Sequence, residues 1–166
     1  MAASDRYREI VQEYSEPLYW HIRRLVVSHE DAQDILQDTL LAIYRNLWQL
    51  RDASRTRAWA YRIATNKVNR FFRRRSREVP SGELYDALCE SLAASEYVDW
   101  DKTAEIRLQK AVMRLTPHQQ TVFNLRYHDD MDYAEMSRVT GSSPDSLKVT
   151  WHTVKNKIKE YLENEQ

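Results

Sequence analysis

The sequence has few of the residues that interrupt helices, with two glycines and four prolines among 166 residues. Alanine, leucine, arginine, glutamine and glutamate are plentiful, so the composition favours an all-α fold and disfavours a turn-rich β fold. The single cysteine, Cys89, excludes a disulfide framework and a cysteine-based zinc site and indicates a reducing compartment. No apolar run approaches the roughly 20 residues of a membrane span, and the N-terminus lacks the apolar core of a signal peptide. We therefore expect a soluble cytoplasmic protein without membrane insertion.

Charge is unevenly distributed, although the 25 basic and 25 acidic side chains cancel in total. Between Arg45 and Arg77 the only acidic residue is Asp52, which is the electrostatic pattern of a polyanion-binding surface. From Glu78 to Asp101 there are seven acidic residues and neither lysine nor arginine. We interpret residues 79–101 as an acidic linker between two small helical domains, residues 1–78 and 102–166.

Apolar spacing predicts the helices of the first domain. A helix over about residues 5–27 should be kinked or broken near Glu16, because Pro17 interrupts its pattern. Ser28 stands at an N-cap position, and the apolar residues that follow predict one long amphipathic helix reaching Leu50. After the polar loop RDASRTR, a further helix has the sequence AWAYRIATNKVNRFFRRRSR.

This last helix interleaves aromatic and basic side chains, a combination that suits single-stranded nucleic acid. Stacking of an unpaired base on an aromatic ring is worth roughly 1–3 kcal/mol. Aromatic residues at helical spacing are also typical of a hydrophobic core, and for Trp59 we favour core packing.

The second domain ends in a helix-turn-helix pattern. Thr116 and Gln119 form a capping box, a short helix from Tyr133 stops at Gly141, and Ser142 or Ser143 caps the last helix. In that helix one face is apolar, and the other carries Lys148, His152, Lys155 and Lys159. The second helix of such a motif enters the major groove of DNA, although a lysine-rich outer face is also typical of an ordinary solvated helix.

No enzymatic chemistry is indicated. The five histidines are scattered and show no metalloprotease-like spacing. His128, Asp129, Asp130 and Asp132 cluster between two helices, where capping and solvation explain them better than a metal site. We expect no catalytic residue, metal or cofactor.

Three blocks of the sequence together resemble the extracytoplasmic-function (ECF) sigma factors, small bacterial initiation factors of the sigma-70 family. They are HEDAQDILQDTLLAIYRN, TRAWAYRIATNKVNRFFRRR and LTPHQQTVFNLRYHDDMDYAEMSRVTGSSPDSLKVTWHTVKNKIKEYL. Their order and spacing make the resemblance more specific than a helix-turn-helix alone. It implies that residues 1–78 bind core RNA polymerase and melt and read the −10 element, and that residues 102–166 bind the −35 element.

The resemblance also assigns residues. Asp34, Gln37 and Asp38 would bind the clamp helices of the polymerase largest subunit. Unpaired −10 DNA would be held by Arg57, Trp59, Tyr61, Arg62, Asn66, Lys67, Asn69, Arg70, Arg73 and Arg74. Duplex −35 DNA would be met by Ser146, Lys148, Val149, Thr150, His152, Thr153 and Lys155.

Several positions depart from the family pattern, including Thr65, Asn69 and the arginine-poor start of the last helix, so we do not expect a stereotyped promoter sequence. The resemblance implies an anti-sigma factor as a frequent partner, which no residue here establishes. The alternative function is a stand-alone helix-turn-helix regulator, which would bind duplex DNA tightly without polymerase.

Overall fold

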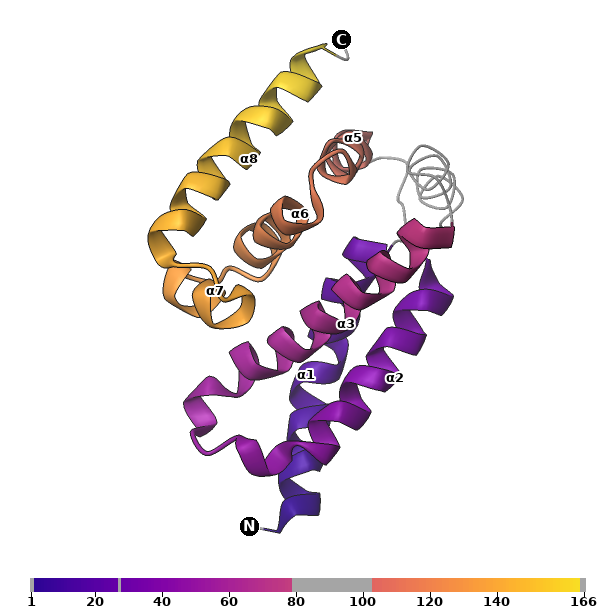
Figure 1. Cartoon of the computed structure of the whole chain (residues 1–166), viewed down its shortest axis with the longest axis vertical. Coiled ribbons are helices and arrows are strands. Elements are labelled where there is room, and N and C mark those ends of the chain that lie inside the picture. Colours follow the sequence, from indigo (N-terminus) through magenta and orange to yellow (C-terminus); the bar gives the residue numbers. More distant parts are fainter. Residues whose placement is uncertain (1, 27, 79–102, 165–166) are drawn as a thin grey trace.

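The computed structural model describes residues 2–26, 28–78 and 103–164, and within these ranges every regular element is helical. The predicted acidic linker lies outside the described residues. Three long helices form the N-terminal module: α1 (Ala3–Val26), α2 (His29–Arg45) and α3 (Thr56–Glu78). Two short 3-10 turns, η1 (Leu47–Gln49) and η2 (Ala53–Arg55), connect α2 to α3. Figure 1 shows these helices side by side, with the N-terminus at the end far from α5.

Helix α1 runs from Ala3 to Val26 with Pro17 inside it, so the break considered near Glu16 was wrong. Proline removes the hydrogen bond to the carbonyl four residues earlier, here that of Glu13. Both Pro17 and Glu13 are exposed, so water can donate a hydrogen bond to the Glu13 carbonyl instead. Leu18 and Ile22, on the opposite side of the helix, are fully buried and hold α1 in the core.

Helix α2 begins as predicted and ends earlier. The Ser28 hydroxyl accepts a hydrogen bond from the backbone N–H of Asp31 at 3.4 Å. The helix stops at Arg45 rather than continuing to Leu50. Asn46 explains the difference, because its side-chain amide donates to the carbonyl of Ala42 at 2.8 Å and caps the helix end. Leu47 and Leu50 are still buried, because the 3-10 turn η1 that follows the helix carries them into the core.

The C-terminal module consists of α5 (Thr103–Met113), α6 (Pro117–Phe123), the π-helical turn η3 (Asn124–His128), α7 (Tyr133–Thr140) and α8 (Pro144–Asn164). The predicted capping box at Thr116 and Gln119 is confirmed. Gly141 ends α7 with φ 81°, a conformation that glycine adopts without strain. Ser143, rather than Ser142, caps α8, since its hydroxyl accepts from the backbone N–H of Ser146 at 3.1 Å.

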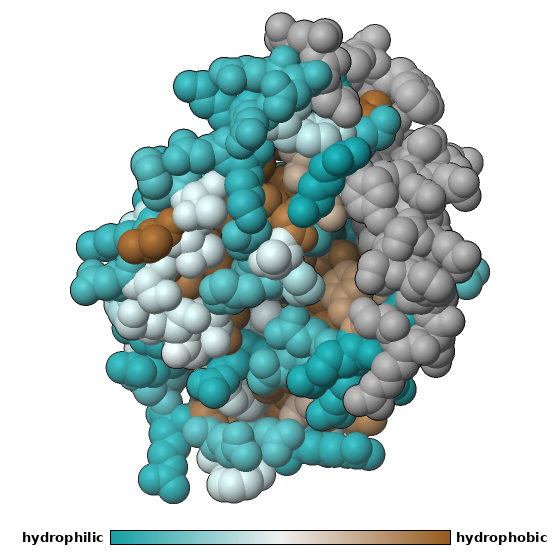
Figure 2. Space-filling view, turned by 45° about the horizontal axis from the view of Figure 1, so that its top comes forward, coloured by the Kyte–Doolittle hydropathy of each residue, from teal (hydrophilic) through white to brown (hydrophobic). Residues whose placement is uncertain are grey.

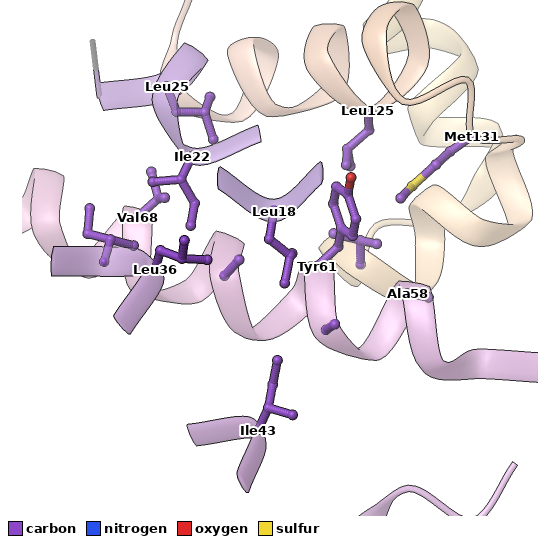
Figure 3. Packing of buried hydrophobic residues seen from close by; sticks show 14 of the residues in the cluster. Leu18, Ile22, Leu25, Leu36, Ile43, Ala58, Tyr61, Val68, Leu125 and Met131 are labelled. Carbon is purple, nitrogen blue, oxygen red and sulfur yellow. The ribbon is translucent and has the colours of Figure 1, made fainter. Parts of the chain in front are cut away.

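One hydrophobic core joins the two modules, a feature that the sequence did not indicate. Leu125, Met131 and Met136 of the C-terminal module are fully buried in the same cluster as Leu18 and Tyr61 of the N-terminal module. Figure 3 shows Tyr61 of α3 lying close to Leu18, Leu125 and Met131. Burying each such side chain is worth roughly 1.5–3 kcal/mol. Helix α7 therefore packs firmly against α3.

Candidate nucleic-acid and partner interfaces

Helix α2 presents the predicted polymerase-binding residues to solvent. Asp34, Gln37 and Asp38 are all exposed, at the spacing that places them on one helix face. Ile35 and Leu36 are buried on the other side and fix the orientation of that face. The three side chains are thus brought together and remain accessible.

Three exposed hydrophobic residues that sequence reasoning had not assigned follow in the chain, Leu41 and Tyr44 on α2 and Trp48 in the turn η1. Leu41 is 45% exposed, Tyr44 57% and Trp48 72%. They follow Asp34 and Asp38 at steps of three or four residues. Their position outside the buried stripe of α2 is the signal that could have identified them. Large apolar side chains that stay exposed together mark a surface for a protein partner.

The loop before α3 is ordered by its own polar groups. The Asp52 carboxylate accepts hydrogen bonds from the backbone N–H of Ser54 at 3.0 Å and from its hydroxyl at 2.7 Å. These bonds lower the pKa of Asp52 below its ordinary value. Residues 51–55 are exposed, so the loop is free to meet a ligand.

The predicted −10 residues on α3 divide into an exposed set and a packed set. Six are exposed: Arg62, Asn66, Asn69, Arg70, Arg73 and Arg74, while Lys67 is half-buried. Trp59 is half-buried against the core, as the core interpretation predicted, and Tyr61 is only 2% exposed. Helix α3 therefore brings together a basic face with two amides, and it directs two aromatic rings inward.

A cleft of about 520 Å³ lies beside this basic face. Asn66, Asn69 and Arg73 line one wall, and the opposite wall comes from α6 and α7 of the C-terminal module, including His118 and Thr140. On the face drawn in Figure 2 the surface is largely hydrophilic, with hydrophobic residues showing in recesses between polar side chains. The exposed amides of α3 thus line a cleft whose other residues include side chains of α6 and α7.

Arg57, at the N-terminal end of α3, bridges the modules. Its guanidinium donates two hydrogen bonds to the Glu135 carboxylate, one of them at 3.0 Å from Nε, and a third to the carbonyl of Asp129 at 3.2 Å. A bidentate pair of this kind is strong and directional. The hydrogen bonds to Glu135 raise the pKa of Arg57.

Tyr61 makes a second bridge. Its hydroxyl donates to the Asp129 carboxylate at 2.9 Å. Burial, reinforced by the Asp129 charge, raises the pKa of the Tyr61 phenol. The buried His21 imidazole lies beside them, with Nδ1 3.6 Å from the other Asp129 oxygen and Nε2 3.0 Å from the Thr65 hydroxyl. Partial burial, followed by the charge of Arg24, lowers the pKa of the neighbouring His128 to about 4.

The turn that supplies Asp129 also supplies a helix cap. Asp132 caps α7 by accepting from the backbone N–H of Glu135 at 2.8 Å, which confirms the capping interpretation. Asp129 bonds Tyr61, a contact 68 residues away in sequence that local patterns could not show. Among the described residues, no group of three or more histidine, cysteine or acidic side chains is placed to hold a metal ion.

Helix α8 presents the predicted −35 residues on its outer face. Ser146, Lys148, His152 and Lys155 are exposed, Val149 is 67% exposed, and Thr150 and Thr153 are half-buried. Leu147, Val154 and Ile158 are buried on the opposite face, as the spacing predicted. The Lys148 ammonium lies 5.8 Å from the centre of the Tyr133 ring, within reach of a cation–π contact across the turn.

Comparison with known families accounts for both modules. Residues 10–78 match the family described as Sigma-70 region 2, and residues 105–158 match the one described as Sigma-70, region 4. The chain belongs to the sigma-70 family. Its relatives place it among the ECF sigma factors, whose partners are core RNA polymerase and promoter DNA. We use region 2 for α1–α3 and region 4 for α5–α8.

Curated relatives are similar over most of the chain. The RNA polymerase sigma-E factor of Streptomyces avermitilis is 28% identical over 159 residues, which cover 95% of this chain and 86% of that protein. The ECF RNA polymerase sigma factor BldN of Streptomyces coelicolor is 30% identical over 151 residues, covering 87% of this chain and 56% of that protein.

Solved structures show the same fold. The sigma factor RpoE of Bartonella quintana, in complex with the anti-sigma factor NepR, superposes with a TM-score of 0.74 at 18% identity, covering 97% of this chain and 99% of that one. CnrH, in complex with the cytosolic domain of CnrY, gives a TM-score of 0.69 at 20% identity, with coverage of 98% of this chain and 91% of that one.

Sigma factors are non-enzymatic initiation factors. None of the described helices combines the length and apolarity needed to cross a bilayer.

Proposed function

We propose that different segments of this sigma factor bind different partners. Residues 1–78 bind the clamp helices of the polymerase largest subunit and capture unpaired −10 bases, while residues 102–166 bind the −35 duplex and residues 79–101 connect them. The observation that supports this proposal most directly is the separation of three exposed faces on α2, α3 and α8. Each face has the chemistry suited to its partner.

The polymerase-binding face comprises Asp34, Gln37 and Asp38 together with Leu41, Tyr44 and Trp48. Carboxylates opposite a basic partner give steering and register. The apolar end supplies the burial that holds the complex, because exposed aromatic anchors carry most of the binding energy at interfaces. The proposed face thus combines recognition at one end with affinity at the other.

The −10 face is centred on Asn66. Its amide carries both a donor and an acceptor, so it can read the edge of an unpaired base. Arg62, Lys67, Arg70, Arg73 and Arg74 hold phosphates, which adds affinity that is independent of sequence and sensitive to salt. The exposed loop of residues 51–55 helps to hold a base that has left the stack.

The −35 face is the N-terminal half of α8. Lys148, Val149, His152 and Thr153 face the bases of the major groove, and Ser146, Thr150 and Lys155 contact phosphates. With Thr153 where the family more often has arginine, base recognition here relies less on bidentate contacts to guanine.

The chain itself performs no covalent chemistry, which is left to the polymerase, and it acts in the cytoplasm. We also infer an anti-sigma partner. The similar structure of RpoE contains a sigma factor bound to an anti-sigma factor, and its similarity extends over 97% of this chain.

The replacement Asn66→Ala tests the proposal. On a promoter selected in vitro by the holoenzyme, we expect promoter opening, measured by permanganate reactivity, to fall by roughly fivefold to a hundredfold, since one base contact is worth roughly 1–3 kcal/mol. Binding to core polymerase should not change. The control Gln12→Ala removes an exposed amide from α1 and should behave as the native chain. Loss of polymerase binding in Asn66→Ala would show that α3 was assigned to the wrong partner.

A further inference from the structure

The side chain of Lys148 lies over an aromatic ring that belongs to the other helix of the helix-turn-helix. Its ammonium is 5.8 Å from the centre of the Tyr133 ring. Tyr133 is the first residue of α7, and Lys148 lies in the second turn of α8. Figure 1 shows α7 beside the beginning of α8. A tyrosine outside α8 is therefore placed against the side chain to which base recognition is assigned.

Tyr133 is itself held in place by residues outside α8. Its ring is half-buried and packs against the hydrophobic core. A second cation, the Arg126 guanidinium of η3, lies over the same ring at 4.8 Å from its centre. Arg126 is fixed in turn, because its Nη1 donates a hydrogen bond at 2.9 Å to the carbonyl of Met131, a fully buried residue. The ring is thus a rigid support beneath a flexible lysine.

Lysine gains more than arginine from such a support. Its ammonium is a point charge on a flexible four-carbon stem, whereas arginine presents a rigid fork of donors. An unsupported lysine can donate to phosphates and to several base atoms, and fixing it on DNA costs rotamer entropy. A cation within about 6 Å of a ring centre is attracted to the face of that ring. Tyr133 therefore limits the positions that the Lys148 ammonium takes before DNA binds.

We propose that Tyr133 is a positioning residue for −35 recognition, which orients Lys148 toward one base position, and that Arg126 fixes the ring. This inference rests on the assignment of Lys148 to the bases of the −35 element. Neither Tyr133 nor Arg126 belongs to the predicted −35 set, which lies entirely on α8. Because Tyr133 restricts a contact and adds none, it governs the difference in affinity between bases more than affinity itself.

Removal of the ring tests this role. Tyr133→Leu keeps an apolar side chain for the core and loses the ring face, whereas Tyr133→Phe keeps the ring and loses only the hydroxyl. Tyr127→Leu is the matched control, because it makes the same change at a tyrosine of region 4 that is 56% exposed on η3. The double variant Tyr133→Leu/Lys148→Ala shows whether Tyr133 acts through Lys148.

The readout is base preference at the −35 element, selected by the holoenzyme from duplexes randomised at that element. At the position that Lys148→Ala also affects, we expect Tyr133→Leu to lower the preference by roughly twofold to fivefold, the size of an exposed cation–π contact. Tyr133→Phe and the control should keep the native preference. An unchanged or sharper preference in Tyr133→Leu, or an equal loss in Tyr133→Phe, would overturn the role of the ring.

The double variant separates positioning from a structural role. If Tyr133 acts through Lys148, Tyr133→Leu should cause no further loss of preference in the Lys148→Ala background. An additional loss there would overturn positioning. Lys148→Ala alone tests the assignment on which the inference rests. Unchanged preference in that variant would remove both the assignment and the inference, whereas a changed preference with Tyr133→Leu at the native value would remove only the positioning role.

Discussion

Replacement of Trp48 by alanine should weaken the complex with core polymerase while leaving the free protein folded. The indole is 72% exposed, so the free chain gains little from it. A tryptophan can bury up to about 250 Å² at an interface, which leaves roughly 180 Å² of newly buried surface here. At about 25 cal/mol/Å² the upper limit is roughly 4.5 kcal/mol.

Part of this gain is lost on binding. Fixing a side chain at an interface costs about 0.5–1.5 kcal/mol. A net loss of roughly 3 kcal/mol on replacement is within the range of interface hot spots and corresponds to about 150-fold in Kd. We expect Trp48→Ala to show this weakening in a titration of the N-terminally labelled chain with core polymerase.

The control is Val149→Ala, which shortens an apolar side chain that is 67% exposed on the proposed −35 face of α8. Its Kd for polymerase should equal the native value. The thermal midpoint of both variants should stay within a few degrees of the native protein. A Trp48→Ala variant that bound core polymerase within threefold of native would refute the extension of the binding face beyond Asp38.

The remaining predictions concern region 4. Lys148→Ala should weaken −35 duplex binding by roughly fivefold to a hundredfold and change base preference in a selection experiment, since a good base contact is worth about 1–3 kcal/mol; unchanged preference would remove Lys148 from the base-reading set. Thr116→Ala should lower the free energy of unfolding by about 1 kcal/mol in urea. It removes the hydroxyl that accepts from the Gln119 backbone at 3.3 Å, and an unchanged midpoint would show that the capping box contributes nothing.

Helix ends were largely predictable from sequence, because they depend on a few adjacent residues. The capping box at Thr116, the cap at Ser28 and the left-handed Gly141 each satisfy backbone groups within one turn. The buried and exposed faces of α8 followed from periodicity for the same reason. The end of α2 was missed because Asn46 acts through its side chain within an otherwise continuous apolar pattern.

The packing of region 4 on region 2 could not be predicted in this way. Asp129 bonds Tyr61, and Glu135 bonds Arg57 across 78 residues. Nothing in the local pattern distinguishes these acids from solvated ones. The exposure of Trp48 differs in this respect, because Trp48 lies outside the apolar spacing of Leu47 and Leu50 and could have been found from the sequence.

The central claim is that α2 of region 2 carries the polymerase-binding face. The most direct test is size-exclusion co-elution with core RNA polymerase, without DNA, of the native chain and of two variants with equal charge changes. Asp34→Asn/Asp38→Asn alters the proposed face, and Asp130→Asn/Glu160→Gln alters exposed acids of region 4. We predict that the native chain and the region 4 variant co-elute with polymerase and that the α2 variant is depleted from the complex. Equal co-elution of all three would contradict the assignment of this face.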